Sequence, residues 1–230
     1  MSGKSGVEIG GSSMNQSERR QILIQFLIKE QSGYRKIMVP HDSDEQKKML
    51  RSLINIRMAA PVSDEFQRIQ DEYLQEENRK RGIVELSALT PVQNEIYLWR
   101  GDITRLACGA IVNAANSGMT GCYQPCHNCI DNCIHTHAGI QLRNYCSDLM
   151  EKQGHEEPTG MAKITPAFNL PCEYVIHTVG PIVRGKLTAL HRRQLSSCYR
   201  SCMELADQNQ VCSIAFCCIS TGVFMFPNEE

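Results

Sequence analysis

The sequence predicts an α/β protein in which helices flank a mostly parallel sheet, with a helical extension in front of it. Up to about residue 82, apolar residues recur at helical spacing between helix-start signals. Beyond Gly82, short runs rich in β-branched residues alternate with longer amphipathic segments. Strands that alternate with helices form parallel sheets covered on both faces. We therefore divide the chain into a flexible leader or tag (1–14), a helical extension (15–82) and an α/β domain (83–230).

Two or three packed helices are expected in the extension. An apolar band runs through the segment QILIQFLIKE, which starts at residue 21. Ser43 stands three residues before Gln46, a capping-box arrangement that predicts a helix start at Ser43. Ser63 precedes a third segment, DEFQRIQDEYLQEENRKR, whose many charges indicate a solvated helix face.

The α/β domain is expected to hold several strands and two long helices. Strands are predicted at 95–100, 110–114, 161–167, 173–179 and 212–220, and helices at 128–150 and 187–208. Ligands of such folds bind beyond the carboxyl ends of the strands, which selects the loops 101–104, 113–133 and 220–227. Because the sequence stops at Glu230, right after a helix-start pattern, we expect the domain to be truncated at its C-terminus.

Composition argues against several classes of protein. The chain has 230 residues, of which 42% are hydrophobic and 21% charged, and its formal net charge is −1. That balance argues against attachment to nucleic acid or to anionic membranes, and no apolar run is long enough to span a bilayer. The first residues lack the apolar core of a secretory signal. Twelve cysteines without such a signal favour metal binding or burial, in the reducing cytoplasm, over a disulfide framework.

The segment GCYQPCHNCIDNCIHTHAG, residues 121–139, carries the most informative chemical pattern. Cys122, His127 and Cys129 can wrap one zinc ion, because zinc takes thiolate sulfur and imidazole nitrogen in tetrahedral geometry. Three protein ligands with an open fourth position are typical of a catalytic zinc. Cys126 or Cys133 can replace one of the three, and the alternative is a loop of buried thiols that holds no metal.

Polar residues stand at the ends of predicted elements around this loop. Asp131, in the first turn of a helix, is kept ionised by the helix dipole and is a candidate general base. Asn113 and Asn116 end a strand in VNAAN, where an amide can bond ribose hydroxyls or orient a water. Asp102 follows another strand, and its carboxylate can accept from an exocyclic amine. Each has a simpler reading, since Asp and Asn are common at helix starts and in turns.

The loop STGVFMFP, residues 220–227, joins a strand to a helix start and contains Gly222. Backbone N–H groups in such a loop form a concavity that suits phosphate. A single glycine is a weak signal, and the spacing matches neither a Walker A motif nor GxGxxG. Phe224 or Phe226 can stack on a ring or belong to the core.

Taken together, these segments resemble the macrodomain family. GDIT, AIVNAAN, CIDNCIHTHAG, YVIHTVGP and ISTGVF occur in the family's order over about residues 95–230. The Cys–His–Cys segment stands where typical hydrolytic macrodomains have a glycine-rich loop, with Ile130 and Asp131 in place of a Val-Asp pair. The chain is similar to the zinc-containing, sirtuin-linked microbial subgroup, which also carries a helical N-terminal extension. Met225 departs from the family's pattern, which usually has glycine there.

The resemblance implies ADP-ribose as the ligand and a role for each motif. Asp102 holds the adenine amine, and the Ile103 amide supports a phosphate. Asn116 and Asp131 face the distal ribose. The remaining expected contacts are Asn113 and Ile130, the pyrophosphate loop Ser220, Thr221, Gly222, Val223 and Phe224, and the zinc ligands Cys122, His127 and Cys129.

We therefore expect a zinc-dependent hydrolase that removes ADP-ribose from proteins, cleaving its ester to an Asp or Glu side chain. Asp131 and Asn116 are the expected catalytic residues: Asp131 orients or deprotonates a water and Asn116 positions the ribose. The resemblance further implies a companion sirtuin-type ADP-ribosyltransferase and, as substrate, a lipoyl carrier of the glycine-cleavage H type. The alternatives are a reader that binds ADP-ribose without cleaving it, a nucleotide- or nucleic-acid-binding module, and a zinc ion that only ties down its loop.

Overall fold

The centre of the molecule is a four-stranded sheet with the strand order β6-β7-β5-β8. The computed structural model describes residues 14–31, 33 and 37–229, so almost all of the expected leader lies outside the described residues. β5 (Ala110–Ala115) pairs in parallel with β7 (Tyr174–Val179) and with β8 (Ile214–Ala215), whereas β6 (Ala162–Pro166) runs antiparallel to β7. The sheet is thus mostly parallel, as the sequence predicts.

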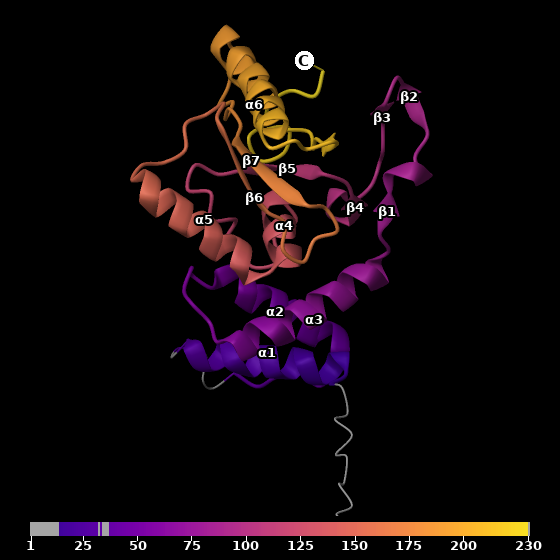
Figure 1. Cartoon of the computed structure of the whole chain (residues 1–230). Helices are drawn as coiled ribbons and strands as arrows, with labels where there is room; N and C mark the ends of the chain where they lie inside the picture. Colours follow the sequence, from indigo (N-terminus) through magenta and orange to yellow (C-terminus); the bar gives the residue numbers. More distant parts are fainter. Residues whose placement is uncertain (1–13, 32, 34–36, 230) are drawn as a thin grey trace, which may run out of the picture.

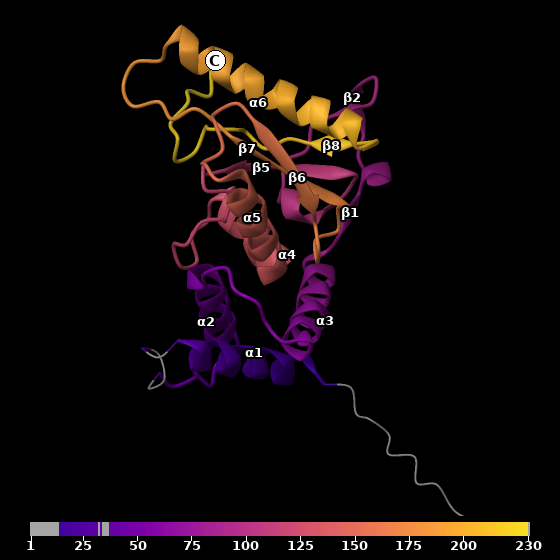
Figure 2. The ribbon, with the colours of Figure 1, turned by 60° about the vertical axis from the view of Figure 1, so that its left-hand side comes forward.

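Helices cover both faces of the sheet (Figure 2). α4 (Ile130–Ala138) and α5 (Ile140–Gln153) lie on one face, and α6 (Ala189–Gln208) lies on the other. Alternate side chains of each strand enter different cores, so Ile111 packs toward α4 and α5 while Val112 packs toward α6. Both faces of the central strands are therefore buried, which explains their nearly continuous apolar sequence.

The described part of the extension forms three helices, which lie beside α4 and α5 on the side away from the sheet (Figure 1). These are α1 (Gln16–Glu30), α2 (Ser43–Ile56) and α3 (Asp64–Arg81). They surround a core of their own, and Ile140 of α5 belongs to that core, so the extension packs directly on the α/β part. Ser63 caps α3 as predicted, since its side chain accepts from the Phe66 N–H.

α2 starts at Ser43 as predicted, but one predicted helix cap and one predicted helix span are wrong. α2 is capped by Asp42, whose carboxylate accepts from two N–H groups of the first turn, so Ser43 is the first helical residue and not the cap. The single helix predicted at 128–150 is two helices that meet at Gly139, where the backbone adopts φ +98° and ψ 173°. That conformation is open only to glycine, and it ends the helical ladder.

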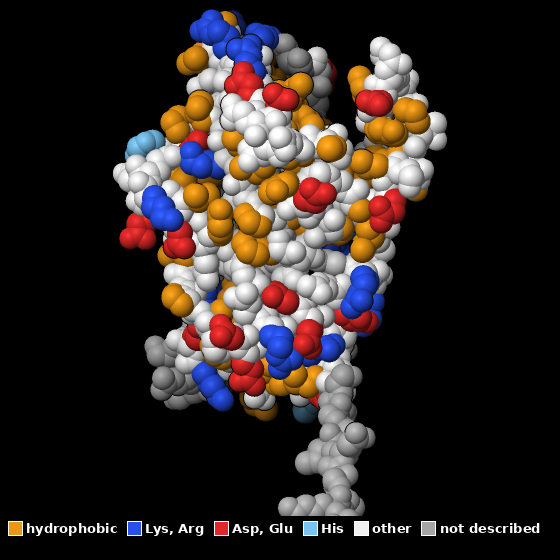
Figure 3. All heavy atoms as spheres, viewed as in Figure 1, with side chains coloured by type: hydrophobic (Ala, Val, Ile, Leu, Met, Phe, Trp, Pro, Cys, Tyr) orange, Lys and Arg blue, Asp and Glu red, His pale blue; other side chains and the backbone are white. Residues whose placement is uncertain are grey.

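Two predicted strands are much shorter than expected. Within 95–100 only Ile96–Tyr97 (β3) forms a strand, and it pairs with Pro91–Gln93 (β2) in a hairpin separate from the main sheet. The hairpin projects from the body and exposes apolar side chains, with Leu98 84% exposed (Figure 3). Within 212–220 only Ile214–Ala215 pairs with the sheet. An apolar run predicts an extended backbone, but its pairing partner decides whether a strand forms.

One more pair of strands, β1 (Val84–Glu85) and β4 (Leu106–Ala107), links the end of α3 to the start of β5. A single 3₁₀ turn at Ile103–Arg105 follows Asp102. Among the described residues, no helix combines the length and the apolar character needed to cross a membrane.

Substitutions at two glycines test why α4 ends at Gly139 and does not continue into α5. A Cβ at Gly139 would lie 2.8 Å from Gln70 Nε2, whereas a Cβ at Gly154, which ends α5 at φ +75°, would meet nothing within 4 Å. We expect Gly154→Ala to lower the free energy of unfolding by about 1 kcal/mol, since only the left-handed backbone is strained. Gly139→Ala adds a steric conflict, and we expect a loss of about 3 kcal/mol or more. Urea denaturation measures both, and equal losses would contradict this account.

Candidate active site

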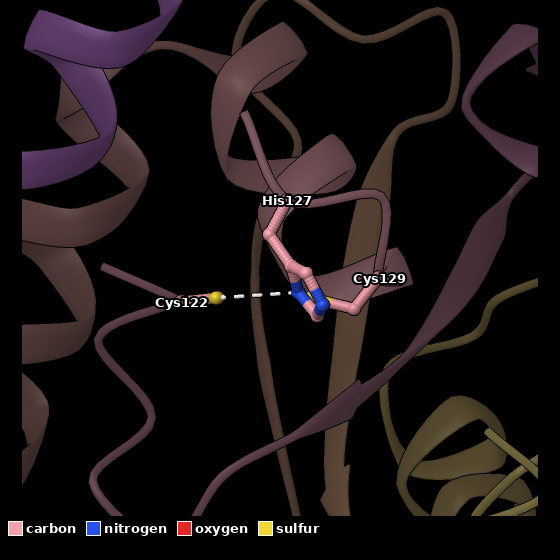
Figure 4. A group of neighbouring side chains, drawn as sticks. All are labelled: Cys122, His127 and Cys129. Carbon is pink, nitrogen blue, oxygen red and sulfur yellow. Dashed lines mark hydrogen bonds between the residues drawn. The ribbon is translucent and has the colours of Figure 1, made fainter. Parts of the chain in front are cut away.

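The loop between β5 and α4 brings the three predicted zinc ligands together (Figure 4). The ligand atoms of Cys122, His127 and Cys129 all lie within 4.8 Å of one another, and Cys122 Sγ lies 3.7 Å from His127 Nδ1. Two ligands of a tetrahedral zinc, one sulfur and one nitrogen, are about 3.6 Å apart at ordinary bond lengths. The donor set and its spacing therefore fit a zinc ion.

The other two cysteines of the segment point elsewhere. Cys126 Sγ lies 3.2 Å from Ser52 Oγ, on helix α2 of the extension. Cys133 Sγ accepts from the Arg51 guanidinium at 3.8 Å. Neither belongs to the group formed by Cys122, His127 and Cys129. Burial is the main cause that raises the pKa of the Cys129 thiol to about 12, and Cys122 and Asp131 raise it further. A divalent cation among these groups would relieve that crowding of like charges.

Asp131 lies in the first turn of α4, two residues after Cys129, and is held by two asparagine amides. Asn113 Nδ2 donates to Oδ1 at 2.8 Å, and Asn116 Nδ2 donates to Oδ2 at 3.2 Å. Only 5% of Asp131 is exposed. Burial raises its pKa to about 6, although the Asn113 amide, the charge of Arg143 and the Asn116 amide all act to lower it. One edge of this carboxylate is thus fixed by the protein, and each oxygen keeps a further lone pair.

A buried histidine fixes the orientation of Asn113. His177 stands beside Asn113 in the neighbouring strand, with its Nδ1 3.1 Å from Asn113 Nδ2 and its Nε2 3.0 Å from Thr165 Oγ1. The Asn113 amide nitrogen has only hydrogens to offer, so His177 Nδ1 accepts and the ring proton is on Nε2. His135 and Cys146 lie near His177 and could form a second metal group, but both nitrogens of His177 are already used. We therefore read His177 as an orienting residue.

Asn113 and Asn116 differ in what they present to a ligand. Asn113 has no exposed surface, so it reaches the predicted ligand only through Asp131. Asn116 is half-buried; its Nδ2 also donates to the Gly121 carbonyl, and its Oδ1 accepts from the Gly118 N–H at 3.0 Å. Gly121 is required beneath His135, because a Cβ there would lie 2.7 Å from the imidazole. Asn116 therefore joins Asp131 to the start of the loop 116–129, which carries the three predicted zinc ligands and is called the metal loop below.

Asp102 caps the 3₁₀ turn and carries an ion pair that the sequence does not reveal. Its Oδ1 accepts from the Thr104 N–H at 3.0 Å, and its Oδ2 pairs with Arg81, the last residue of α3. Burial acts to raise the pKa of Asp102, but the Thr104 hydrogen bonds and Arg81 outweigh it and hold the pKa below its usual range. The Asp102 side chain is 45% exposed, and the Ile103 N–H has no hydrogen-bond acceptor among the described residues. Both groups are thus available to a ligand.

The loop Ser220–Phe224 is folded so that several backbone N–H groups stay open. Ser220 has a left-handed backbone (φ +67°), and its carbonyl accepts from the Phe226 N–H at 2.9 Å. In the described part of the chain, the N–H groups of Gly222, Val223 and Phe224 have no acceptor. Such N–H groups suit the oxygens of a pyrophosphate.

The backbone conformation and exposure of Met225 show how a methionine fits where the family's pattern usually has glycine. Its backbone is left-handed (φ +55°), a conformation in which glycine is favoured, and its side chain is largely exposed. Its N–H donates to the Gly222 carbonyl at 3.0 Å, which closes the end of the loop. A methionine is therefore accommodated at a backbone cost, with its side chain outside the fold.

A model of the Macro domain family matches residues 112–230, which include Asn113, Asp131 and the loop Ser220–Phe224. The chain belongs to the macrodomain family. A protein-ADP-ribose hydrolase of Treponema medium is 60% identical over 221 residues, which cover 94% of this chain and 85% of that protein. One of Staphylococcus aureus strain MRSA252 is 45% identical over 214 residues, or 92% of this chain and 80% of that protein. The crystal structure of a Trypanosoma brucei macrodomain in complex with ADP aligns with a TM-score of 0.56 at 32% identity, over 78% of this chain and 77% of that one.

Within this macrodomain, the predicted residues form two groups and a separate loop. Asn113, Asn116 and Asp131 are joined by hydrogen bonds, and Cys122, His127 and Cys129 form the metal group beside them. Ile130, which begins α4, is partly buried and packs against the core between the sheet and helices α4 and α5. Asp102 and the loop Ser220–Phe224 make no hydrogen bond to either group in the described structure.

Sequence reasoning missed the residues that bond the predicted site residues, or the loop that carries them, and keep them in position. Arg51, Arg81, Arg143 and Asn132 are polar residues within helices, and nothing in their local sequence shows that they are buried or paired. His177 lies in the motif YVIHTVGP, where a polar residue inside a buried strand is a usable signal. The general lesson is that a buried polar residue among apolar neighbours indicates a hydrogen-bond network.

Three buried histidines have lowered pKa values, and we therefore expect the fold to lose stability in mild acid. Burial holds the pKa of His135 well below its usual range and lowers those of His137 and His177 to about 3, with Arg81 contributing at His137. In the unfolded chain they take up protons near pH 6.5, so lowering the pH favours the unfolded state. Asp131 acts in the opposite sense, because its raised pKa lets the folded state bind a proton first. We expect a net loss of about 2–3 kcal/mol between pH 6 and pH 5.

Urea denaturation with a chelator present at both pH values measures this loss free of metal release. His177→Gln keeps one donor and one acceptor but has no proton to gain. It should therefore reduce the slope of stability against pH by about 1 kcal/mol per pH unit. A slope that is flat in the unaltered chain, or unchanged in His177→Gln, would contradict the prediction.

Proposed function

We propose that this macrodomain removes ADP-ribose from modified proteins by a zinc-dependent hydrolysis at the carboxylate-linked ester. Removal of ADP-ribose is the activity for which its relatives in Treponema medium and Staphylococcus aureus are named. At 60% identity over 94% of the chain, that activity extends to this protein, which is a protein ADP-ribosyl hydrolase of the glycosidase class. The finer proposal rests on one observation: a carboxylate fixed by two amides stands two residues from a group of three metal ligands.

Asp131 is suited to hold a water or a ribose hydroxyl. Asn113 and Asn116 each occupy one lone pair of its carboxylate, which sets the plane of the group and leaves one lone pair on each oxygen. A positioned carboxylate can orient a water or take its proton, and such acid–base assistance contributes about 10²–10⁴-fold to a rate. Asn116, which bonds both Asp131 and the metal loop, keeps these two parts in register.

Zinc held by Cys122, His127 and Cys129 would supply Lewis-acid polarisation of an oxygen at the reacting centre. The protein provides the remaining positioning. Asp102 would accept from the adenine amine, and the Ile103 amide and the open amides of Gly222, Val223 and Phe224 would bind phosphate oxygens. Binding energy from these remote contacts would hold the distal ribose against Asp131.

The partners are proposed on chemical grounds and by resemblance. An ADP-ribosylated protein is the substrate class, and a lipoyl carrier of the glycine-cleavage H type, modified by a companion sirtuin-type transferase, is the substrate we propose. A net charge of −1 argues against nucleic acid or an anionic membrane as a partner. We propose that the protein acts in the cytoplasm, where free thiols such as its twelve cysteines persist.

A non-catalytic ADP-ribose reader is the second candidate. It would use Asp102 and the pyrophosphate loop in the same way. The network of Asn113, Asn116 and Asp131 favours the enzyme, because a reader has no need for a fixed carboxylate at the distal ribose.

Replacing the carboxylate separates the two candidates. We expect Asp131→Asn to keep ADP-ribose affinity within about threefold but to lower the release of ADP-ribose from a carboxylate-linked protein by about 10²–10⁴-fold. The matched control is Asp148→Asn, an exposed carboxylate on α5, which should leave the rate unchanged. Release by the unaltered chain that survives in Asp131→Asn would rule out the proposed role of Asp131. Binding without any release by the unaltered chain would favour the reader.

Removing the metal tests zinc dependence. Cys129→Ser should lose the bound zinc and lower the release rate by about 100-fold or more, whereas Cys212→Ser, at an exposed thiol outside the group, should keep both. Metal content by atomic emission and release rates with a chelator measure the effect. If the chelator lowers the melting temperature but the rate per folded molecule is unchanged, the zinc only ties down its loop.

A further inference from the structure

Helix α2 of the extension makes direct contact with the loop that carries the metal ligands. Arg51 Nη2 donates to the His127 carbonyl at 2.7 Å and to Asn132 Oδ1 at 3.0 Å. The Arg51 guanidinium is half-buried, and its Nε is buried with no acceptor in the described structure. A guanidinium in such a place is held by its hydrogen bonds, since burying an unpaired charge is costly.

Asn132, which Arg51 bonds, makes hydrogen bonds to the other two proposed ligand residues. Its side chain is fully buried, and its Nδ2 donates to the Cys122 carbonyl at 3.3 Å and to the Gln124 carbonyl at 2.9 Å. Its backbone N–H donates to Cys129 Sγ at 3.4 Å. Arg51 and Asn132 together therefore bond the backbone at two of the ligand residues and the sulfur of the third.

Asn55, one turn further along α2, fixes the tip of the loop. Its Oδ1 accepts from the Cys126 N–H at 2.9 Å, and its Nδ2 donates to Thr136 Oγ1 on α4 at 2.9 Å. Cys126 has a left-handed backbone (φ +52°), which a residue other than glycine adopts only when its surroundings hold it. Asn55 is fully buried, so this contact is shielded from water.

We propose that Arg51 and Asn55 are positioning residues of the zinc site, and that the N-terminal extension sets the metal affinity by holding Cys122, His127 and Cys129 in place before zinc binds. This proposal rests on the zinc site proposed above. The loop has no helix or strand of its own between β5 and α4. Without the contacts from α2, metal binding would have to offset the conformational entropy lost when the loop becomes ordered, and the zinc affinity would be lower. Residues that orient metal ligands from outside typically change metal affinity by about 10–100-fold.

Zinc affinity of the full chain, measured by competition with a fluorescent chelator, tests the proposal without reference to hydrolysis. We expect Arg51→Met and Asn55→Leu, which keep the approximate size of each side chain, to weaken zinc binding by about 10–100-fold. Arg51→Lys can still donate one hydrogen bond to the His127 carbonyl and should recover part of the loss. Lys47→Met, at an exposed cation on the same helix, should match the unaltered chain.

Two further measurements separate positioning from packing. ADP-ribose affinity of the variants should stay within about threefold of the unaltered chain, because α2 does not contribute to the proposed nucleotide contacts. Unchanged zinc affinity in both Arg51→Met and Asn55→Leu, with a lower melting temperature of the metal-free proteins, would overturn the proposal. If zinc binds the unaltered chain and is lost in Cys129→Ser but not in Arg51→Met, only this inference fails. If the unaltered chain binds no zinc, the proposed metal site fails as well.

Discussion

The arrangement of this site depends on one buried guanidinium, that of Arg143 on α5. Only 4% of Arg143 is exposed. Its Nη1 donates to the carbonyls of Ile54, Asn55 and Arg57 at the C-terminal end of α2, and its Nε donates to the Thr120 carbonyl at 2.8 Å.

The last turn of α2 contains no basic residue of its own. A side chain from another helix, Arg143, therefore bonds the free carbonyls of α2 and places a positive charge at the negative end of its dipole. Burial lowers the Arg143 pKa from its usual value, but a guanidinium bonded in this way stays charged. The same side chain thus ties the extension to the first residues of the metal loop.

This constraint makes the extension part of the site. A loop without regular structure leaves its backbone polar groups to be satisfied by side chains, water or a ligand. Here the carbonyls of Thr120, Cys122 and His127 are all bonded by side chains from helices. Two of those side chains, on α4 and α5, belong to the macrodomain itself, and the third, Arg51, comes from the extension. The polar contacts on the two sides of the loop differ in origin. On the side of the sheet, Asp131 bonds Asn113 and Asn116; on the other side, Arg51 and Asn55 of the extension bond the loop backbone.

Local signals in the sequence were enough for the alternating order of strands and helices and for the close approach of the three proposed zinc ligands. Cys122, His127 and Cys129 are close in the chain, so spacing alone limits how they can meet. The contacts that sequence reasoning missed join distant residues: Arg51 and His127 are 76 positions apart, and Arg143 and Ile54 are 89 apart. No periodicity encodes such pairs. The strands predicted at 95–100 and 212–220 were too long for the same reason, because pairing depends on a distant partner.

The loop's composition accounts for the presence of a helical extension beside a Cys–His–Cys insertion. A glycine-rich loop, as in typical hydrolytic macrodomains, can turn sharply and direct its own N–H groups to a ligand. Between Gly121 and Ile130 this chain has no further glycine, and Cys126 takes a left-handed conformation that glycine would adopt without strain. The strained backbone at Cys126 must be held by neighbouring groups, and loop carbonyls such as that of His127 need hydrogen-bond donors from outside the loop. Helix α2 supplies them through Arg51 and Asn55, so the loop and the extension form one structural unit and neither is a free addition to the macrodomain.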